Sequence, residues 1–206
     1  MTYKSILCLN GDLPEKDFFK KFKLPVIAAD GAANKLYELG ILPSVVIGDL
    51  DSIESHSGVP LIHIEDQNQC DYEKSMKYLK KHKLLPTIVL GMSGGELDHI
   101  LNNISVFMSH PFGNLLYAPP LYGTLLCKSQ NLFTLPIHTK VSIIGLPKTK
   151  ITTQGLEWDL TEQKLYFPGF NSCLNRMKEN TLSIQVIDGK ALLLAHKFFS
   201  LDSSIQ

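Results

Sequence analysis

The chain has 206 residues, of which 44% are hydrophobic and 19% are charged, a balance that excludes a disordered or fibrous protein. Twenty basic residues balance twenty acidic ones, so we expect no general attraction to nucleic acid or to an anionic membrane. The four cysteines lie far apart without a CxxC spacing, and the N-terminal apolar run is short, so we expect reduced thiols, no zinc site, no signal peptide, no membrane span and a cytoplasmic location.

The first 120 residues alternate short apolar runs with segments of helical period. The apolar runs predict strands over 5–10, 25–30, 44–50, 59–65, 87–92 and 113–118. The helical periods predict helices over 15–22, 31–40, 71–82 and 97–110. This alternation predicts an α/β domain over residues 1–120, with a mostly parallel sheet between two layers of helices and right-handed crossovers.

The character of the sequence changes after Pro119 and Pro120. Short strand-like runs follow, separated by Gly, Pro, Asn and Asp, over 121–127, 131–136, 140–146, 150–160, 164–168, 181–188 and 190–198. No segment with helical period stands out among them. The pattern predicts a second, all-β domain over residues 121–206, a β-sandwich, with Trp158 in its core.

Acidic residues stand at turns in four separate segments of the first domain, as Asp30, Asp49 with Asp51, Asp71 and Asp98. Ligands of open α/β sheets bind outside the carboxyl ends of the strands, so we expect these turns to gather at one edge. Two unit charges about 4 Å apart repel by about 4 kcal/mol at an effective dielectric of 20, so ionised carboxylates gathered there require a divalent cation or shared protons. Mg²⁺ prefers oxygen ligands and also holds substrate phosphates, which predicts a metal and polyphosphate site.

Structural explanations exist for several of these acids. The segment GDLDS, residues 48–52, can form an Asx turn as well as bind a metal through Asp49 and Asp51, with Ser52 free to cap the next segment. Asp30 can cap the helix that begins after it. The small residues between Asp30 and Asn34 also allow a nucleotide close to the backbone, at a helix N-terminus that favours phosphate.

Asp71 and Lys74 lie one helical turn apart, with Asp71 at the expected N-cap. They can form a surface ion pair, or the lysine can meet a phosphate beside metal-bound carboxylates. Gln67 can be a solvated loop residue, or its amide can bind a heterocycle.

Residues 91–99, GMSGGELDH, place Gly94 and Gly95 between a strand and a helix. Such loops can cradle phosphate with backbone amides, although the Walker lysine is absent. We expect Asp98 to face the site or to cap the helix, and His99 to act as a hydrogen-bonding group rather than a general base.

The order of these motifs closely resembles the thiamine pyrophosphokinase family over nearly the whole chain. The matching segments are DGAAN at 30–34, GDLDS at 48–52, DQNQCDYEK at 66–74, GMSGGELDH at 91–99, GLEWDL at 155–160 and NSCLN at 171–175. The resemblance implies transfer of the β,γ-diphosphoryl group of ATP to the hydroxyl of thiamine, with Mg²⁺ and with release of AMP. It also implies a homodimer with active sites at the subunit interface.

The resemblance assigns roles to individual residues. It implies metal ligands at Asp30, Asp49, Asp51 and Asp71. It implies catalytic roles for Asp71, Lys74, Asp49 and Asp51, with Asp71 the candidate to orient or deprotonate the hydroxyl of thiamine. It implies contacts to ATP from Asp30, Asn34, Ser52, Gly94, Gly95, Asp98 and His99. It implies contacts to thiamine from Gln67, Asp71, Ser172 and Asn175, so the first domain binds ATP and Mg²⁺ and the second binds thiamine and dimerises.

Some positions depart from the pattern of the family. Glu96 stands where arginine is common, and we hypothesise that Arg176, the only arginine of the chain, or a nearby lysine supplies the missing positive charge. Met177 stands where an aromatic residue often stacks on thiamine, and a methionine can still pack against a ring. Other departures are Ser44, Cys70 and Leu174.

Two other functions remain open on the sequence. One is a diphosphokinase of the same fold that acts on another hydroxymethyl heterocycle, such as a pterin. The other is a nucleotide- or thiamine-binding protein without turnover, which is suggested by the loss of a phosphate contact where Glu96 replaces the usual arginine.

Overall fold

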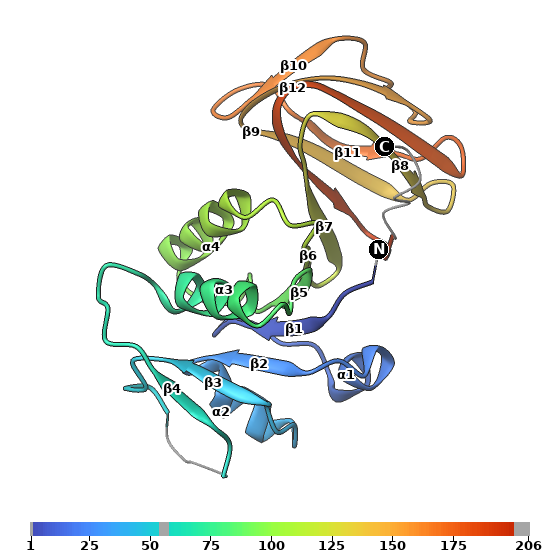
Figure 1. Cartoon of the computed structure of the whole chain (residues 1–206). Helices are drawn as coiled ribbons and strands as arrows, with labels where there is room; N and C mark the ends of the chain where they lie inside the picture. Colours follow the sequence, from blue (N-terminus) through green and yellow to red (C-terminus); the bar gives the residue numbers. More distant parts are fainter. Residues whose placement is uncertain (1, 54–57, 200–206) are drawn as a thin grey trace. The chain divides into compact units, whose positions relative to one another are not determined.

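The structure is a computed structural model that describes residues 2–53 and 58–199. The described residues form two compact units, one over residues 2–118 and one over residues 119–199 (Figure 1). The first unit contains helices and a parallel sheet, and the second is built from antiparallel strands. The predicted fold class, an α/β region followed by an all-β region, is therefore confirmed.

The first unit has a six-stranded parallel sheet in the order β6-β5-β1-β2-β3-β4. Its strands are β1 (Ser5–Cys8), β2 (Val26–Ala29), β3 (Val45–Gly48), β4 (Leu61–His63), β5 (Thr87–Leu90) and β6 (Leu115–Ala118). Its helices are α1 (Lys16–Phe22), α2 (Ala32–Glu38), α3 (Asp71–Lys81) and α4 (Leu97–Ser109). Every residue of β1, β2, β3 and β5 is buried, as expected for strands covered on both faces.

The strand order of the first unit reverses at β1, which pairs with β2 on one side and with β5 on the other. At such a switch point the loops after adjacent strands diverge and leave a crevice at the carboxyl edge of the sheet. The loops after β1, β2, β3 and β5 all lead into this edge, which is where the sequence predicts the acidic residues.

The second unit contains β7 (Leu121–Leu126), β8 (Ser129–Thr134), β9 (Lys140–Gln154), β10 (Gln163–Tyr166), β11 (Ser172–Arg176) and β12 (Thr181–Ala195). The start of β9 pairs with β11 and its end with β10, while the start of β12 pairs with β8 and its end with β7. β9 and β12 also pair with each other along their length. The unit therefore has two four-stranded halves, β11-β9-β12-β7 and β10-β9-β12-β8, which share two long strands.

The prediction of separate strands over 140–146 and 150–160, and over 181–188 and 190–198, was wrong, because β9 and β12 are each continuous. The pairing of β9 with β12 shifts register between Val186 and Asp188 and again between Gly189 and Ala191. Gly189 has φ +76°, and a Cβ there would lie 2.2 Å from the carbonyl oxygen of Lys148. The residues that indicated a turn in the sequence thus form bulges within one strand.

Candidate active site

A cavity of about 760 Å³ lies within the first unit, at the carboxyl edge of its sheet. Its walls come from the loops after β1, β2, β3 and β5 and from the first turns of α3 and α4. The residues singled out from the sequence that line it are Asp30, Asp49, Ser52, Gln67, Asp71, Lys74, Gly94, Gly95, Asp98 and His99. Among the described residues that line the cavity, Lys74 is the only lysine or arginine.

Three carboxylates converge at this edge: Asp30, Asp49 and Asp51 each place a carboxylate oxygen within 4.8 Å of the others. Asp30 is only 4% exposed, and its Oδ1 is buried without a hydrogen-bond partner. Burial raises the pKa of Asp30; the nearby hydroxyl of Ser52 lowers it, and the charges of Asp71, Asp49 and Asp51 raise it further. A buried carboxylate with an oxygen that lacks a partner, close to two further carboxylates, is the arrangement expected of a cation site.

Gly48 at the end of β3 allows these acids to approach one another. A Cβ at this position would lie 2.7 Å from Cβ of Asp30 and 3.2 Å from Oδ1 of Asp71. Any side chain here would separate the loop after β2 from the start of α3. The glycine before the Asp49 and Asp51 pair is therefore required by the packing of the acids.

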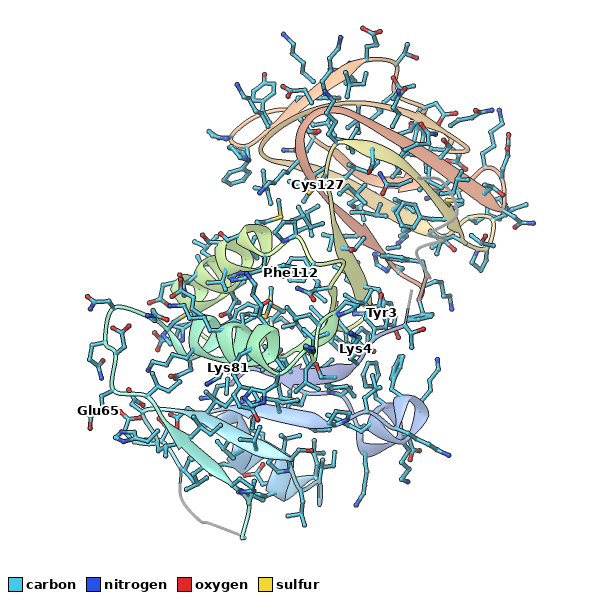
Figure 2. All side chains as sticks on the ribbon, viewed as in Figure 1. Tyr3, Lys4, Glu65, Lys81, Phe112 and Cys127 are labelled. Carbon is cyan, nitrogen blue, oxygen red and sulfur yellow. The ribbon has the colours of Figure 1, made fainter. Side chains whose placement is uncertain are left out.

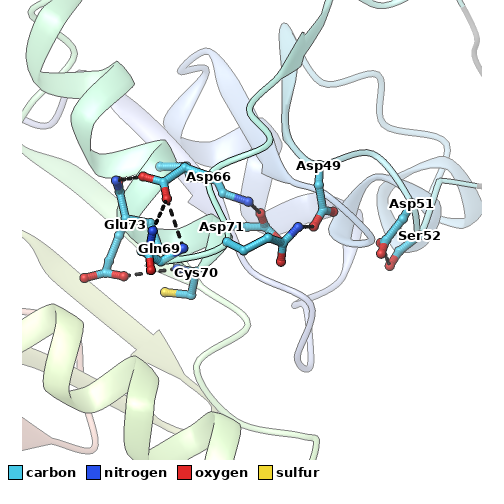
Figure 3. A network of polar contacts seen from close by, with 11 residues as sticks. Asp49, Asp51, Ser52, Asp66, Gln69, Cys70, Asp71 and Glu73 are labelled. Carbon is cyan, nitrogen blue, oxygen red and sulfur yellow. Dashed lines mark hydrogen bonds and ion pairs between the residues drawn. The ribbon is translucent and has the colours of Figure 1, made fainter.

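Asp71, labelled in Figure 3, lies in the first turn of α3. It forms an ion pair with Lys74, whose Nζ is 2.9 Å from Oδ1 of the aspartate. Lys74 is 3% exposed, so the alternative of a surface ion pair does not hold. Desolvation lowers the pKa of Lys74, but its hydrogen bond to Asp71 and the charges of Asp71, Asp49 and Asp66 raise it overall. The lysine is thus held charged in an acidic cavity.

The prediction of Asp71 as the N-cap of α3 was wrong, because Cys70 occupies that position. The backbone N–H of Cys70 donates to Oε2 of Glu73 at 3.1 Å, and the Cys70 side chain accepts from the backbone of Glu73, which completes a capping box. The helix start is therefore satisfied without Asp71. Its carboxylate is left to face Lys74 and the cavity.

Gln67 lies beside Asp49, with its amide nitrogen 3.4 Å from Oδ2 of the aspartate. Partial desolvation raises the pKa of Asp49, but the amide of Gln67, the charge of Lys74 and backbone donors lower it overall. Asp49 is therefore more readily ionised than Asp30.

The residues of α2 hold the neighbouring loops in place. Asn34 donates from Nδ2 to the backbone carbonyl of Ser52 at 2.8 Å, so it supports the loop after β3 and does not itself line the cavity. The hydroxyl of Ser52 donates to Oδ1 of Asp51 at 2.8 Å. Asp30 does not cap α2, whose N-cap is Gly31 without a side-chain cap bond.

Gly94 and Gly95, which follow β5, differ in backbone conformation and in the space around them. Gly94 has φ +77°, and a Cβ there would lie 1.9 Å from Cγ of Asp12, whereas a Cβ at Gly95 would meet nothing within 4 Å. The left-handed backbone therefore favours glycine at position 94, and a side chain there would also displace the carboxylate of Asp12. Asp98 lines the cavity and accepts from the backbone N–H of His99 at 2.8 Å, while the N-cap of α4 is Glu96.

The loop after β1 contributes residues that the sequence did not predict for the site. Asn10 and Gly11 line the cavity, and Lys35 of α2 donates to both of their backbone carbonyls at 2.9 Å. A Cβ at Gly11 would lie 2.1 Å from the carbonyl oxygen of Ser93, so this loop and the one after β5 touch. The signal was an Asn-Gly pair directly after the first buried strand.

In the second unit, Asn175 fastens the loop that carries Trp158. Its Nδ2 donates to the carbonyl of Trp158 at 2.8 Å and to Oγ of Ser172 at 3.3 Å, and its Oδ1 accepts from the backbone N–H of Trp158 at 3.3 Å and of Arg176 at 2.8 Å. Asn175 and Ser172 are both buried. The amide of Asn175 is thus used within the protein.

Trp158 is exposed to solvent, whereas Met177 is buried. Trp158 was predicted in the core but is 62% exposed, so that prediction was wrong. Met177 is fully buried, so it offers no surface to a bound ring. Trp158 thus offers an exposed aromatic surface on the loop that Asn175 holds.

All four cysteines are free thiols. None of the helices in the described part of the chain combines the length and the hydropathy needed to cross a membrane.

The fold and the cavity place the first unit among α/β proteins whose ligand site lies at the carboxyl edge of a parallel sheet. Comparison with known proteins narrows this class. Residues 17–115 match the model of the "Thiamin pyrophosphokinase, catalytic domain", and residues 133–190 match that of the "Thiamin pyrophosphokinase, vitamin B1 binding domain". The chain belongs to the thiamine pyrophosphokinase family.

Curated relatives and solved structures agree with this assignment. The chain is 28% identical to thiamine pyrophosphokinase 1 of Arabidopsis thaliana, with 89% of this chain and 83% of that protein covered. It is 27% identical to thiamine pyrophosphokinase 1 of Oryza sativa subsp. japonica, with 77% and 74% covered. The crystal structure of yeast thiamin pyrophosphokinase matches its fold with a TM-score of 0.82 at 20% identity, covering 94% of this chain and 86% of that one.

Proposed function

We propose that the protein transfers the diphosphoryl group of ATP to the hydroxyl of thiamine, giving thiamine diphosphate and AMP. The observation that carries this proposal is the convergence of the carboxylates of Asp30, Asp49 and Asp51, of which Asp30 has a buried oxygen without a partner. Asp30 and Asp49 line the cavity together with Lys74. Membership of the family supports this reaction type, and the geometry offers the charges that polyphosphate chemistry requires.

The three carboxylates fit Mg²⁺, with Asp71 as a further candidate ligand on the same side of Gly48. Oxygen ligands of full negative charge suit a hard cation, and Oδ1 of Asp30 lacks any other partner. Bound there with ATP, Mg²⁺ would neutralise charge on the phosphoryl oxygens. Without a cation, the same cavity would repel a triphosphate, since Lys74 is the only lysine or arginine among the described residues that line it.

Different residues of the site take different roles in the transfer. The hydroxyl oxygen of thiamine bonds to the β-phosphorus of ATP, the bond from that phosphorus to the bridging oxygen of AMP breaks, and the hydroxyl proton passes to a base. We assign Asp71 to orient the hydroxyl and accept this proton, with Lys74 2.9 Å away balancing charge on the phosphoryl group. Gln67 keeps Asp49 ionised and is a candidate to contact thiamine.

We assign the nucleotide to the first unit, near residues 94–99, Asp30 and Ser52. Asn34 acts on this site through the loop carbonyl of Ser52. Glu96 is exposed and offers no positive charge to a phosphate. Arg176, exposed on β11, remains our candidate to supply one.

We assign thiamine in part to the second unit, where Trp158 offers an exposed indole. The buried amide of Asn175 holds the backbone of this residue at both its N–H and its carbonyl. Ser172 and Asn175 thus contribute by positioning the tryptophan.

We also propose a homodimer with active sites at the subunit interface, and its test is the mass in solution by light scattering.

Exposed apolar side chains support the dimer. Tyr166, Phe167 and Phe170 surround the turn after β10, and Leu97 and Leu101 are exposed on α4. We place the protein in the cytoplasm, because its four cysteines are free thiols.

The experiment is a product assay with Mg²⁺, ATP and thiamine. Equal amounts of AMP and thiamine diphosphate are expected, and both are expected to disappear in an Asp49→Asn/Asp51→Asn variant. Formation of ADP with thiamine monophosphate would overturn the mechanism. ATP binding without product would indicate another acceptor, which a series of hydroxymethyl heterocycles including a pterin would identify, or a protein that binds without turnover.

A further inference from the structure

A second cavity, a groove of about 370 Å³, lies between α3 and the strand β4. One face of α3 lines it, with Lys74, Lys77, Tyr78, Lys81 and His82 following the i, i+3, i+4, i+7, i+8 spacing of a helix face. Figure 2 shows Lys81 on this helix. The opposite wall consists of Ile62 and Ile64, and Gln69 and Lys74 line this groove and the catalytic cavity alike.

The charges of the two cavities are opposite. The catalytic cavity is lined by Asp30, Asp49, Asp71, Glu73 and Asp98 against a single lysine. The groove is lined by three lysines and a histidine, and no carboxylate is among the described residues that line it. The neighbouring acid Asp66 interacts with Lys77 but lies outside this lining. Lys74 is paired with Asp71, so the lysine charge left to the groove is that of Lys77 and Lys81, which lie one helical turn apart. Two such like charges attract an anion.

The groove also offers a surface for a planar ring. Tyr78 and His82 stack with ring centroids 4.0 Å apart and an interplanar angle of 28°. The pair lies at the C-terminal end of α3 and lines the groove together with Ile62 and Ile64. Aromatic faces bind planar rings by offset stacking, and aliphatic side chains pack on the other face of such a ring. An anion without a ring would leave this apolar surface uncovered.

We propose that the groove is a second binding site, distinct from the catalytic cavity, for an organic phosphate that carries a planar heterocycle. Lys77 and Lys81 hold the phosphate, and the Tyr78 and His82 pair with Ile62 and Ile64 holds the ring. AMP and thiamine monophosphate share this chemistry. The positive charge of the groove comes from lysine side chains, so binding there requires no metal ion.

The test is equilibrium dialysis in EDTA, where the acidic catalytic cavity lacks the cation that a phosphate needs. The probes are AMP, thiamine monophosphate and inorganic pyrophosphate. We expect at least one of AMP and thiamine monophosphate to bind at one site in the absence of metal. The probe that binds more tightly shows whether the natural ligand is a nucleotide or a thiamine phosphate. A Lys77→Ala/Lys81→Ala variant is expected to bind it about tenfold more weakly or worse, because two charged hydrogen bonds are lost.

The matched control is Lys80→Ala/Lys83→Ala, which removes the same charge from lysines near the end of α3 that do not line the groove. This control and Asp49→Asn/Asp51→Asn are expected to bind as the unchanged protein does. The proposal is overturned if neither ring-bearing probe binds in EDTA, if the Lys77→Ala/Lys81→Ala variant binds as tightly as the control, or if pyrophosphate binds as tightly as both. None of these measurements depends on turnover.

Discussion

Nζ of Lys74 lies 2.9 Å from Oδ1 of Asp71, one turn earlier on α3, and the lysine side chain is almost completely withdrawn from water. Several carboxylates surround this one ammonium group, so its pKa is raised despite the desolvation that lowers it. It therefore stays charged at neutral pH, next to the aspartate that we assign as the base.

The first prediction concerns this ion pair. Lys74→Ala removes the single lysine charge of the catalytic cavity and leaves Asp71 without its partner. We expect kcat for thiamine diphosphate formation to fall by about 10²–10³, the usual effect of removing one preorganised electrostatic contact in a transition state. The measurement is the rate of AMP release at saturating ATP. An unchanged rate, equal to that of the exposed control Lys80→Ala, would contradict the assignment.

The second prediction concerns Asp30 and the stability of the metal-free protein. The native pKa of this acid is raised, so between its ordinary value of about 3.9 and the raised value the folded state binds more protons than the unfolded state. Stability therefore falls as the pH rises through this window. Asp30→Asn removes the effect and also tolerates the positive φ of 38° at this position.

In EDTA at neutral pH we expect Asp30→Asn to melt higher than the unchanged protein, by about 2–4 °C for each kcal/mol gained in a chain of this size. Added Mg²⁺ should raise the melting temperature of the unchanged protein and have less effect on the variant. Thermal unfolding with and without Mg²⁺, between pH 4 and pH 8 (roughly the range around and above the ordinary pKa), checks both expectations. A lower melting temperature for the variant in EDTA would refute this account of Asp30.

The third prediction separates two adjacent glycines. Gly94→Ala places a methyl group against Asp12 in a left-handed backbone conformation, and we expect it to destabilise the protein by about 1–3 kcal/mol. Gly95→Ala meets nothing within 4 Å, and its free energy of unfolding is expected to change by less than about 0.5 kcal/mol. Urea unfolding of both variants is the measurement. Equal losses in the two would show that the contact with Asp12 is unimportant.

The fourth prediction concerns Trp158 as a surface for thiamine. Trp158→Ala is expected to raise the KM for thiamine about tenfold, equivalent to about 1.4 kcal/mol, because a stacking surface is lost. The KM for ATP should not change, and Trp158→Phe should keep most of the affinity. Asn175→Ala should resemble Trp158→Ala, since it frees the same loop. A rise in both KM values in Trp158→Ala would point to a general structural defect instead.

The parallel sheet of the first unit could be predicted because its central strands are buried on both faces, which produces short continuous apolar runs such as residues 26–29 and 45–48. The long strands of the second unit could not be predicted from the sequence. Asp188 and Gly189 are typical turn residues, and only the pairing of β12 with β9 shows that they form a bulge within a strand.

The acidic cluster could also be predicted, because the carboxyl ends of parallel strands meet at one edge of the sheet. The faces of β11 could not be assigned in this way. Its register against β9 shifts between Ser172 and Asn175, and Leu174 has φ +55°. A bulge reverses the alternation of inward and outward side chains, which explains why Met177 lies in the core.

The loop after β1 could not be predicted for a different reason. Asn10 carries no charge, so it does not stand out among residues chosen for metal chemistry. Its place in the cavity follows from its strand, because β1 lies at the switch point of the sheet.

The two long strands of the second unit have a consequence for how it unfolds. β9 supplies one end to β11 and the other to β10, and β12 does the same for β7 and β8. Neither half keeps its central strands once the other half is removed. A protease nick within β9 or β12 therefore releases no stable fragment, and denaturant melts both halves in one cooperative transition.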